Sequence, residues 1–385
     1  MSSVATTISG YGADESAMRD YLIEGERRAM QLGNRGPVRF NPDGSLHEDI
    51  VAEYWRTGFY VFEGVVSPDE LDDLAAGLAD IRARLPVSKD AEVDAQGRPA
   101  LGVDCEAPTL FWSKPLGDPF GGTDIANGRH PVKMAEPQAL AGTPAEIVYL
   151  ILGSLQFSDA CLRLYGHPKL LQVAAAINGD DFVPFTEGIF IKEPGLGASV
   201  AWHQDGTTHW DSPDWDAGSH GFNFMVQLYG CTAANGVWVL PGTHHAGRID
   251  IKALAAQAGS DRLVGAVPMI CAPGDVVISN RQILHGSFAN TSDQWRVTFN
   301  MGFHRRRSVL NVRGGGVHNA PAVYDDARIR TRSRVLGYAI DARSQRFPHE
   351  APFRYAPFAQ SGQTHVWDEA AKSSMKDYNL LDFSI

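Results

Sequence analysis

The chain has 385 residues, with 34 Lys and Arg against 45 Asp and Glu, so its formal net charge is −11. This acidic balance argues against nucleic acid as a partner, because the phosphate backbone attracts basic surfaces. Hydrophobic residues make up 44% and charged residues 21% of the chain, which excludes a mainly disordered, collagen-like or coiled-coil protein. We expect one domain with insertions, since β-rich folds often hold a chain of this length in a single domain.

Nothing in the sequence predicts a membrane segment or a secreted protein. The longest apolar run, residues 147–152, is far shorter than the roughly 20 residues that cross a bilayer. The N-terminus lacks the charged start and apolar core of a secretory signal. The four cysteines are dispersed without a CxxC pair, which favours reduced structural thiols. These features predict a cytoplasmic location.

The first part of the chain predicts an irregular arm and then a short helix and strand. Residues 1–47 contain scattered Gly, Pro and Asn, which is typical of an N-terminal arm without regular structure. Ile50 and Tyr54 lie on one face of a helix that ends before Gly58, and residues 59–62 form a strand-type run of aromatic and β-branched side chains.

The next helix has a clear start and stop. Ser67 and Glu70 match a capping box, with a Pro at the first helical position, and an apolar stripe follows until Pro86. Residues 87–145 are rich in Gly, Pro and Asp and too long for an ordinary connection, which indicates an insertion or lid. A further helix begins at Pro168.

The second half of the chain predicts a β-rich core and a C-terminal extension. Residues 180–304 consist of short apolar runs separated by Pro-Gly and Asn-Gly turns, which is typical of a sandwich or barrel of β-strands. Residues 305–385 carry many arginines, which we interpret as a solvated surface strand or loop in preference to an anion-binding patch. The apolar residues of the segment 378–385 would dock on the protein itself or on a second copy, as in a homodimer.

Three residues have the spacing and chemistry of a metal site. His203 and Asp205 are separated by one residue, so on a strand they project from the same face, and a predicted strand leads to His285. Two imidazoles and one carboxylate form the facial triad of non-haem Fe(II) oxygenases. Zinc is the weaker candidate, although its catalytic sites also use three such ligands. By itself His-x-Asp is a weak signal, because it is frequent by chance.

An arginine in the following strand strengthens this interpretation. Arg296 lies eleven residues after His285, and a guanidinium can bind a carboxylate through two parallel hydrogen bonds. This geometry suits the distal carboxylate of 2-oxoglutarate chelating the iron. Ser287 lies on the same face of its strand as His285, within reach of that carboxylate.

The sequence resembles the phytanoyl-CoA dioxygenase superfamily of Fe(II)/2-oxoglutarate-dependent oxygenases. The resemblance covers roughly residues 48–305 and rests on several motifs in a fixed order. These motifs are GFYVFEGVVSPDEL at 58–71, GHP at 166–168, FIKEP at 190–194, WHQD at 202–205, LPGTH at 240–244, PGDVV at 273–277, HGS at 285–287, and Arg296.

The resemblance implies a mainly β fold with flanking helices, built on a double-stranded β-helix (a jelly roll of the cupin type). It implies His203, Asp205 and His285 as iron ligands, with Arg296 and Ser287 holding 2-oxoglutarate. Halogenases of the family replace the carboxylate ligand by a small residue, so Asp205 argues against halogenation. The segment 233–241 is one residue shorter than usual, which leaves Gln227 as a candidate second contact to the co-substrate or an interior amide.

Three aromatic or imidazole side chains near the first motif are candidates for the substrate pocket. His209 and Trp210 closely follow the ligand pair, and Trp202 precedes it. As a ligand His209 is disfavoured, because the facial set is already complete. Trp202 also has a simpler interpretation as a core or rim aromatic. The aromatic surroundings favour a mid-sized organic substrate, such as a secondary metabolite, with an acyl thioester as the alternative.

The expected reaction is oxidation of an unactivated C–H bond, with hydroxylation as the default outcome. It would use Fe(II), O₂ and 2-oxoglutarate, which is decarboxylated to succinate. Desaturation, cyclisation, epoxidation or endoperoxide formation would need the same ligands. Two other classes remain open: a cupin-type metal-dependent hydrolase or isomerase without a keto acid, and a catalytically silent jelly roll that acts as a binding module.

Overall fold

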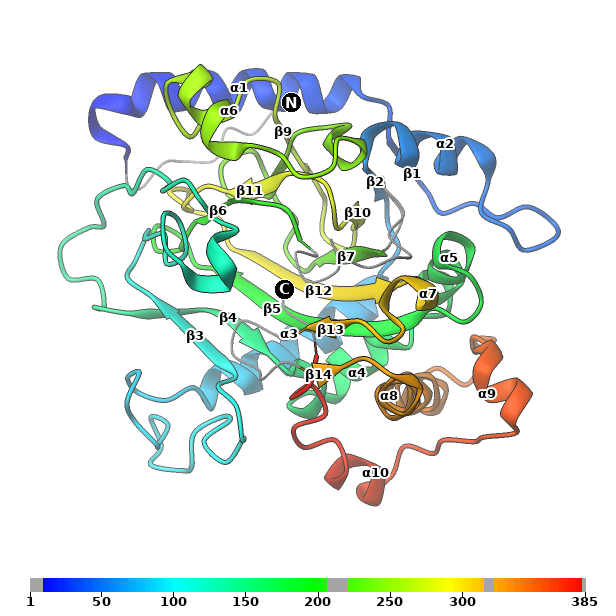
Figure 1. Ribbon diagram of the computed structural model, residues 1–385. Helices are drawn as coiled ribbons and strands as arrows, with labels where there is room; N and C mark the ends of the chain where they lie inside the picture. The colour runs from blue at the N-terminus through cyan, green and yellow to red at the C-terminus, as the bar shows by residue number, and fades with distance from the viewer. Residues whose placement is uncertain (1–9, 206–220, 315–321, 383–385) are drawn as a thin grey trace.

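The computed structural model describes residues 10–205, 221–314 and 322–382 (Figure 1). Its centre is a pair of β-sheets whose facing sides enclose a cavity. The larger sheet has eight strands in the order β1-β2-β10-β7-β12-β5-β4-β3. Its strands are β1 Arg35–Gly36, β2 Phe59–Phe62, β3 Leu110–Ser113, β4 Ile147–Leu152, β5 Val183–Lys192, β7 Gly221–Gln227, β10 Val276–Asn280 and β12 Arg296–His304.

The smaller sheet has four strands in the order β6-β11-β8-β9. They are β6 Val200–His203, β8 Trp238–Val239, β9 Val267–Pro268 and β11 His285–Ser287. A separate two-stranded sheet pairs β13 Arg313–Gly314 with β14 Ala322–Val323. The predicted jelly-roll core with flanking helices is confirmed.

Alternation along the central strands separates the side chains that line the cavity from those of the hydrophobic core. On β12, Arg296, Thr298 and Asn300 line the cavity, while Val297 and Phe299 face the opposite side and join the main hydrophobic cluster. The same alternation holds on β5 and β7. Because successive side chains of a strand point to opposite faces, one strand supplies both the site and the core beneath it.

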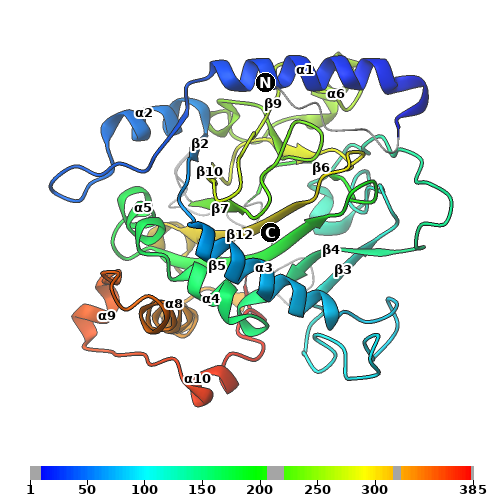
Figure 2. The same cartoon turned by 180° about the vertical axis from the view of Figure 1, so that it is seen from behind.

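Helices cover the outer face of the large sheet. Figure 2 shows α3 and α4 crossing this face, and α8 packs against α4 and β5. The helices are α1 Glu15–Gln31, α2 Glu48–Thr57, α3 Pro68–Ala83, α4 Asp159–Tyr165, α5 Pro168–Asn178, α6 Ile251–Ala258, α7 Arg306–Val309, α8 Asp326–Arg346, α9 Ala356–Ser361 and α10 Glu369–Ser373. None of the helices within the described ranges is both long and apolar enough to cross a lipid bilayer.

Several predicted element boundaries are confirmed. Gly58 ends α2 in the left-handed conformation with φ of 87°, which a glycine adopts without steric cost. The Ser67 side chain accepts a hydrogen bond from the Glu70 backbone N–H, and the Glu70 side chain accepts from Ser67 in return. This capping box fixes the start of α3, and α5 begins at Pro168 as expected.

The prediction of an irregular N-terminal arm is wrong for residues 15–31, which form α1. This helix lies against β9, as both ribbon views show (Figures 1 and 2). Tyr21 stacks on Trp238 with ring centroids 4.6 Å apart. A Cβ at Gly25 would meet the Trp238 ring at 2.2 Å, so the glycine allows the close approach of helix and sheet. Tertiary packing therefore stabilises a helix whose sequence pattern is weak.

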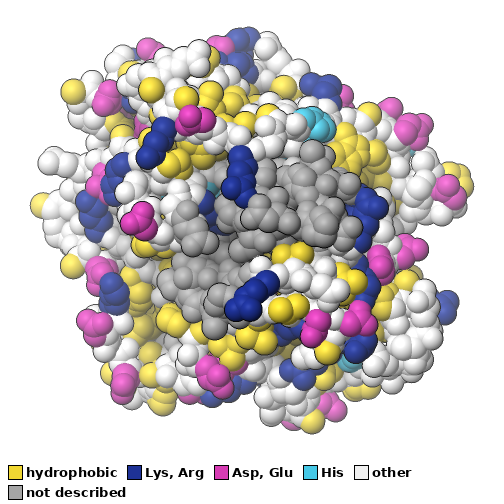
Figure 3. All heavy atoms as spheres, viewed as in Figure 1, with side chains coloured by type: hydrophobic (Ala, Val, Ile, Leu, Met, Phe, Trp, Pro, Cys, Tyr) yellow, Lys and Arg dark blue, Asp and Glu magenta, His cyan; other side chains and the backbone are white. Residues whose placement is uncertain are grey.

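The interpretation of the arginine-rich segment as a surface strand or loop is also wrong, because it forms α8. Arg332 is fully buried, and its Nε donates to both carboxylate oxygens of Asp382 at 3.0 Å. Arg343 pairs with Glu70 and Glu350. Other arginines remain at the surface, where basic and acidic side chains are interspersed (Figure 3).

The described part of the C-terminal tail docks on the body of the same chain. The Tyr378 hydroxyl donates a hydrogen bond to Glu187, a fully buried carboxyl group of β5 that also accepts from Ser154. Arg332 lies over the Tyr378 ring, 4.9 Å from its centroid. The tail thus satisfies a buried acid that would otherwise lack one of its partners.

We predict that Tyr378→Phe lowers the free energy of unfolding by about 1–3 kcal/mol, because it removes a hydrogen bond to a buried carboxyl group and keeps the ring. Urea denaturation followed by circular dichroism measures this change. Tyr229→Phe is the matched control, since Tyr229 is 46% exposed. Equal stability of the two variants would show that the tail contact contributes nothing.

Candidate active site

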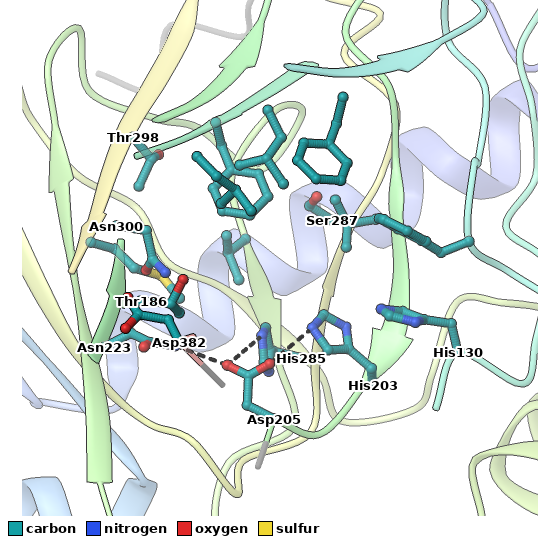
Figure 4. A pocket seen from close by; sticks show the side chains of 18 of the residues that line it. His130, Thr186, His203, Asp205, Asn223, His285, Ser287, Thr298, Asn300 and Asp382 are labelled. Carbon is teal, nitrogen blue, oxygen red and sulfur yellow. Dashed lines mark hydrogen bonds and ion pairs between the residues drawn. The ribbon is translucent and has the colours of Figure 1, made fainter. Parts of the chain in front are cut away.

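Two strands of the small sheet bring the predicted metal ligands together. His203 is the last residue of β6, His285 is the first residue of β11, and the two are directly paired in the antiparallel register. Asp205 follows β6 by two residues. One ligand atom from each of the three side chains lies within 4.8 Å of the others, and all three side chains are buried (Figure 4).

Backbone carbonyls orient both histidine rings. Nδ1 of His203 lies 2.8 Å from the Ala201 carbonyl oxygen, and Nδ1 of His285 lies 3.0 Å from the Ile283 carbonyl oxygen. Each Nδ1 must carry the proton to donate to its carbonyl, so each Nε2 keeps its lone pair. Both Nε2 atoms face Asp205, at 3.4 Å for His203 and 4.0 Å for His285.

The two carboxylate oxygens of Asp205 differ in their hydrogen bonding. Its Oδ2 accepts a hydrogen bond from the Asn223 amide at 2.9 Å. Its Oδ1 is buried and has no hydrogen-bond partner among the residues that the structure describes. A buried oxygen without a partner is costly unless it coordinates a cation. The donor set of two imidazole nitrogens and one carboxylate oxygen therefore fits a divalent metal ion.

The electrostatic environment keeps Asp205 and His285 in the protonation states that a metal requires. Burial raises the pKa of Asp205, but Arg281 and the two histidines outweigh it and hold that pKa well below its usual value. Burial, assisted by the charge of His203, lowers the pKa of His285 to about 4. At neutral pH the site thus combines a carboxylate with a neutral His285, as metal binding needs.

The cluster opens into a cavity of about 1150 Å³, counting the solvent in its mouth. Phe111, Phe120, Leu150, Phe190 and Met225 give this cavity apolar walls. Its polar lining, part of which Figure 4 labels, includes Thr186, Asn223, Ser287, Thr298, Asn300, Arg129, His130 and Arg296. A mostly apolar cavity with a few convergent polar groups is typical of a site for a small organic ligand.

The structure brings both predicted co-substrate residues into this cavity. Arg296 is the first residue of β12 and is 2% exposed, and its Nε has no hydrogen-bond partner among the described residues. Burial lowers the pKa of Arg296 to about 10, so it remains charged at neutral pH. Ser287 lines the same cavity from β11. Figure 4 shows Ser287 and Thr298 on the side of the cavity away from Asp205.

One tentative prediction needs correction. Trp202 does not line the cavity: it is fully buried in a separate cluster, and its Nε1 donates to the Asp261 carbonyl at 2.7 Å. As the neighbour of His203 on β6, it necessarily points to the other face. Gln227 agrees with its second interpretation as an interior amide, because it is buried, is absent from the cavity lining and accepts a hydrogen bond from the Thr298 hydroxyl through Oε1 at 2.8 Å. His209 and Trp210 lie outside the described residues.

The sequence did not single out three residues that contact the ligand cluster. Asn223 holds Asp205, as described above. His130 lies beside His203, with ring centroids 4.3 Å apart, and stacks on Phe120. Arg129 Nη1 lies 3.7 Å from Asp205 Oδ1. His130 and Arg129 come from the insertion, which has no periodic pattern that would place them, whereas the position of Asn223 on a strand was open to prediction.

Both segments outside the recognised motifs contribute to the cavity. The insertion supplies residues 107–109 as well as Phe111, Phe120, Arg129 and His130. The tail supplies Asp377, Asn379, Leu380 and Asp382. The three candidate metal ligands thus lie on the small sheet and the segment directly after β6. The insertion and the C-terminal tail shape the cavity in front of them.

Comparison with known proteins identifies the central part of the chain. Residues 153–298, which include all three clustered ligands and Arg296, match the sequence model of phytanoyl-CoA dioxygenase (PhyH). The predicted resemblance to the phytanoyl-CoA dioxygenase family is confirmed for these residues. The predicted dioxygenase class is confirmed by this match, and the three clustered donors fit the predicted iron.

Individual members of this group are distant relatives. L-Proline trans-4-hydroxylase of Streptomyces griseoviridis is 26% identical over 210 residues, which are 48% of this chain and 74% of that protein. Phytanoyl-CoA dioxygenase domain-containing protein 1 of Danio rerio is 22% identical over 294 residues, which are 69% and 92% of the two chains.

Solved structures give a similarly distant match. EctD from S. alaskensis with bound Fe has a TM-score of 0.46 and 20% identity, covering 69% of this chain and 79% of that chain. EvdMO1 has a TM-score of 0.44 and 23% identity over 65% of this chain, and the match spans about half, 48%, of the EvdMO1 chain.

We predict that Asn223→Ala weakens Fe(II) binding by roughly 10- to 100-fold, because the hydrogen bond that orients Asp205 is lost. Calorimetric titration of the metal-free protein under anaerobic conditions measures the affinity. Asn41→Ala, in a surface turn, should leave it unchanged. An unaltered affinity in Asn223→Ala would mean that Asp205 needs no orientation from this amide.

Proposed function

We propose that the protein hydroxylates an unactivated C–H bond of a small to mid-sized organic substrate, with His203, Asp205 and His285 as the iron ligands. The observation that carries the proposal is the buried carboxylate of Asp205, which faces two oriented imidazole nitrogens at one end of an apolar cavity and whose Oδ1 makes no hydrogen bond to the described residues. Two His and one carboxylate leave three adjacent coordination positions free for a co-substrate and O₂.

When bound, Fe(II) with 2-oxoglutarate and O₂ supplies the oxidation of the C–H bond, coupled to decarboxylation of the keto acid to succinate. The residues of the chain perform the remaining tasks. Ala201 and Ile283 carbonyls hold the two imidazoles, and Asn223 holds the carboxylate. The apolar walls exclude water from the reacting carbon, which limits side reactions.

Arg296 is the proposed receptor for the distal carboxylate of 2-oxoglutarate. Its guanidinium is buried in the cavity that also contains the metal ligands, and its Nε lacks a partner in the described structure. Ser287 adds a hydroxyl donor to the same cavity. A carboxylate would complete this set of donors through charge-assisted hydrogen bonds.

The proposal includes the wider setting predicted from the sequence. The chain acts as one oxygenase domain, in which residues 87–145 and 305–385 shape the pocket for a substrate such as a secondary metabolite. Support comes from the lining residues that both segments supply. We further propose that the enzyme is cytoplasmic and binds neither nucleic acid nor membrane. It would act as a monomer or a homodimer.

Replacement of any ligand should abolish coupled turnover. For His203→Ala, Asp205→Ala or His285→Ala we expect loss of Fe(II) after dialysis and no substrate-dependent succinate, because the coordination set is incomplete. Metal analysis and succinate quantification measure the two effects. Retention of iron and activity in His285→Ala would refute the ligand assignment. Turnover without 2-oxoglutarate would favour the cupin-type hydrolase or isomerase.

Arg296→Met should weaken binding of 2-oxoglutarate by about 2–5 kcal/mol, which is roughly thirtyfold or more in Kd, because a buried charge pair loses one partner. Arg296→Lys should retain part of the affinity, since it keeps the charge without the planar fork. Anaerobic titration of the Fe(II)-loaded protein with 2-oxoglutarate, followed by the metal-to-ligand absorption band, gives both constants. Wild-type affinity in Arg296→Met would place the distal carboxylate elsewhere.

A further inference from the structure

A second buried guanidinium lies in the cavity beside the three candidate metal ligands. Arg129 lines the cavity with its side chain 5% exposed, and Nη1 lies 3.7 Å from Oδ1 of Asp205. The neighbouring His130 fixes this part of the insertion, because its ring is stacked on Phe120 and contacts that of His203. Arg129 is therefore held over the site by packing.

The hydrogen-bonding capacity of Arg129 is largely unused. The ion pair with Asp205 is its only side-chain contact to a polar group in the described structure, and at 3.7 Å it is longer than a hydrogen bond. Its Nε is buried without a partner among the described residues. Burial lowers the pKa of Arg129 to about 10, so the group stays charged at neutral pH. A buried guanidinium with five donors normally has anionic or carbonyl partners.

The charges around the cluster do not balance without a further anion. If Asp205 coordinates the metal through Oδ1, this oxygen binds the ion and interacts less strongly with Arg129. A ferrous ion and a dianionic 2-oxoglutarate, added to Asp205, Arg129, Arg281 and Arg296, leave a net positive charge. In a cavity with apolar walls, a negative group on a second ligand would reduce this charge at short range.

The walls indicate what that second ligand looks like. Phe111 and Phe120 come from the insertion, and Leu150 and Phe190 come from the large sheet. Of the two acidic residues that the tail contributes to the lining, Asp382 is paired with Arg332 and Arg328, and Asp377 accepts a hydrogen bond from the Glu106 backbone N–H. The cavity thus combines an apolar surface with one incompletely paired guanidinium near the metal, which suits an apolar body that carries one acidic group.

We propose that Arg129 binds the carboxylate, or a comparable monoanionic group, of the primary substrate, which makes apolar organic acids the substrate class. This inference rests on the proposed function of the same site. A carboxylate at Arg129 could also come from 2-oxoglutarate, whose metal-bound end lies near the cluster. Arg296 and Ser287 already supply donors for its distal end, and the metal would neutralise the other end, so the substrate is the source that we assign.

The test uses the full-length protein with Fe(II) and 2-oxoglutarate under anaerobic conditions. The probes are hexanoate, 3-phenylpropanoate and cinnamate, each compared with its primary amide by calorimetric titration. We expect at least one acid to bind the wild type about tenfold or more tightly than its amide, since a hydrogen bond to a charged group has this magnitude. Arg129→Gln should remove this preference and leave the affinity for 2-oxoglutarate unchanged.

Two further variants control the result. Arg129→Lys keeps the charge without the fork and should retain part of the preference, which also provides a test if Arg129→Gln does not fold. Arg330→Gln, at an exposed arginine of α8, should behave as the wild type.

Each other outcome contradicts a specific claim. If no acid is preferred over its amide by the wild type, or if the preference survives in Arg129→Gln, the inference is wrong. If Arg129→Gln loses affinity for 2-oxoglutarate instead, the carboxylate at Arg129 belongs to the co-substrate. If the wild type forms no absorption band with Fe(II) and 2-oxoglutarate, the proposed function fails, whereas a normal band with equal binding of acids and amides rejects only the inference.

Discussion

The antiparallel pairing of β6 with β11 is the constraint on which the site depends. It places His203 directly opposite His285 and directs both rings to the same side of the small sheet. Asp205 follows on the same chain segment, so two short strands fix all three donors. Each donor is oriented by a group that the fold itself provides, a backbone carbonyl for each imidazole and the Asn223 amide for the carboxylate.

The large sheet supplies the other half of the arrangement. Its central strands β5, β7 and β12 present polar side chains to the cavity and apolar side chains to the helices behind them. The hydrophobic core therefore stabilises the same strands that position Arg296 and Thr298. Fold stability and the geometry of the polar lining are coupled, because a slip of one residue in register would exchange the two faces.

The sequence allowed the core of the site to be predicted because strand alternation and turn chemistry are local. The spacing of His203 and Asp205, the turn before His285 and the strand of Arg296 each depend on a few neighbouring residues. The same rule applied to Trp202 would have placed its side chain on the opposite face from His203, so that error was avoidable. The capping box of Ser67 and Glu70 is a further local pattern whose prediction is confirmed.

Features that depend on distant residues escaped prediction. The helix α8 is rich in arginine and has little apolar periodicity, and its buried Arg332 is explained only by Asp382, fifty residues later. The helix α1 depends on Trp238 of the small sheet. Arg129 and His130 lie in an insertion without regular strands around them, so only the folded chain shows that they reach the ligand cluster.

The most direct test of the central claim is a crystal structure of the protein with Fe(II) and 2-oxoglutarate, prepared without oxygen. The account predicts one iron ion about 2.0–2.2 Å from Nε2 of His203, Nε2 of His285 and an oxygen of Asp205, with the distal carboxylate of the keto acid at Arg296. An ion bound elsewhere, or a keto acid that does not share the ion with these three side chains, would contradict it.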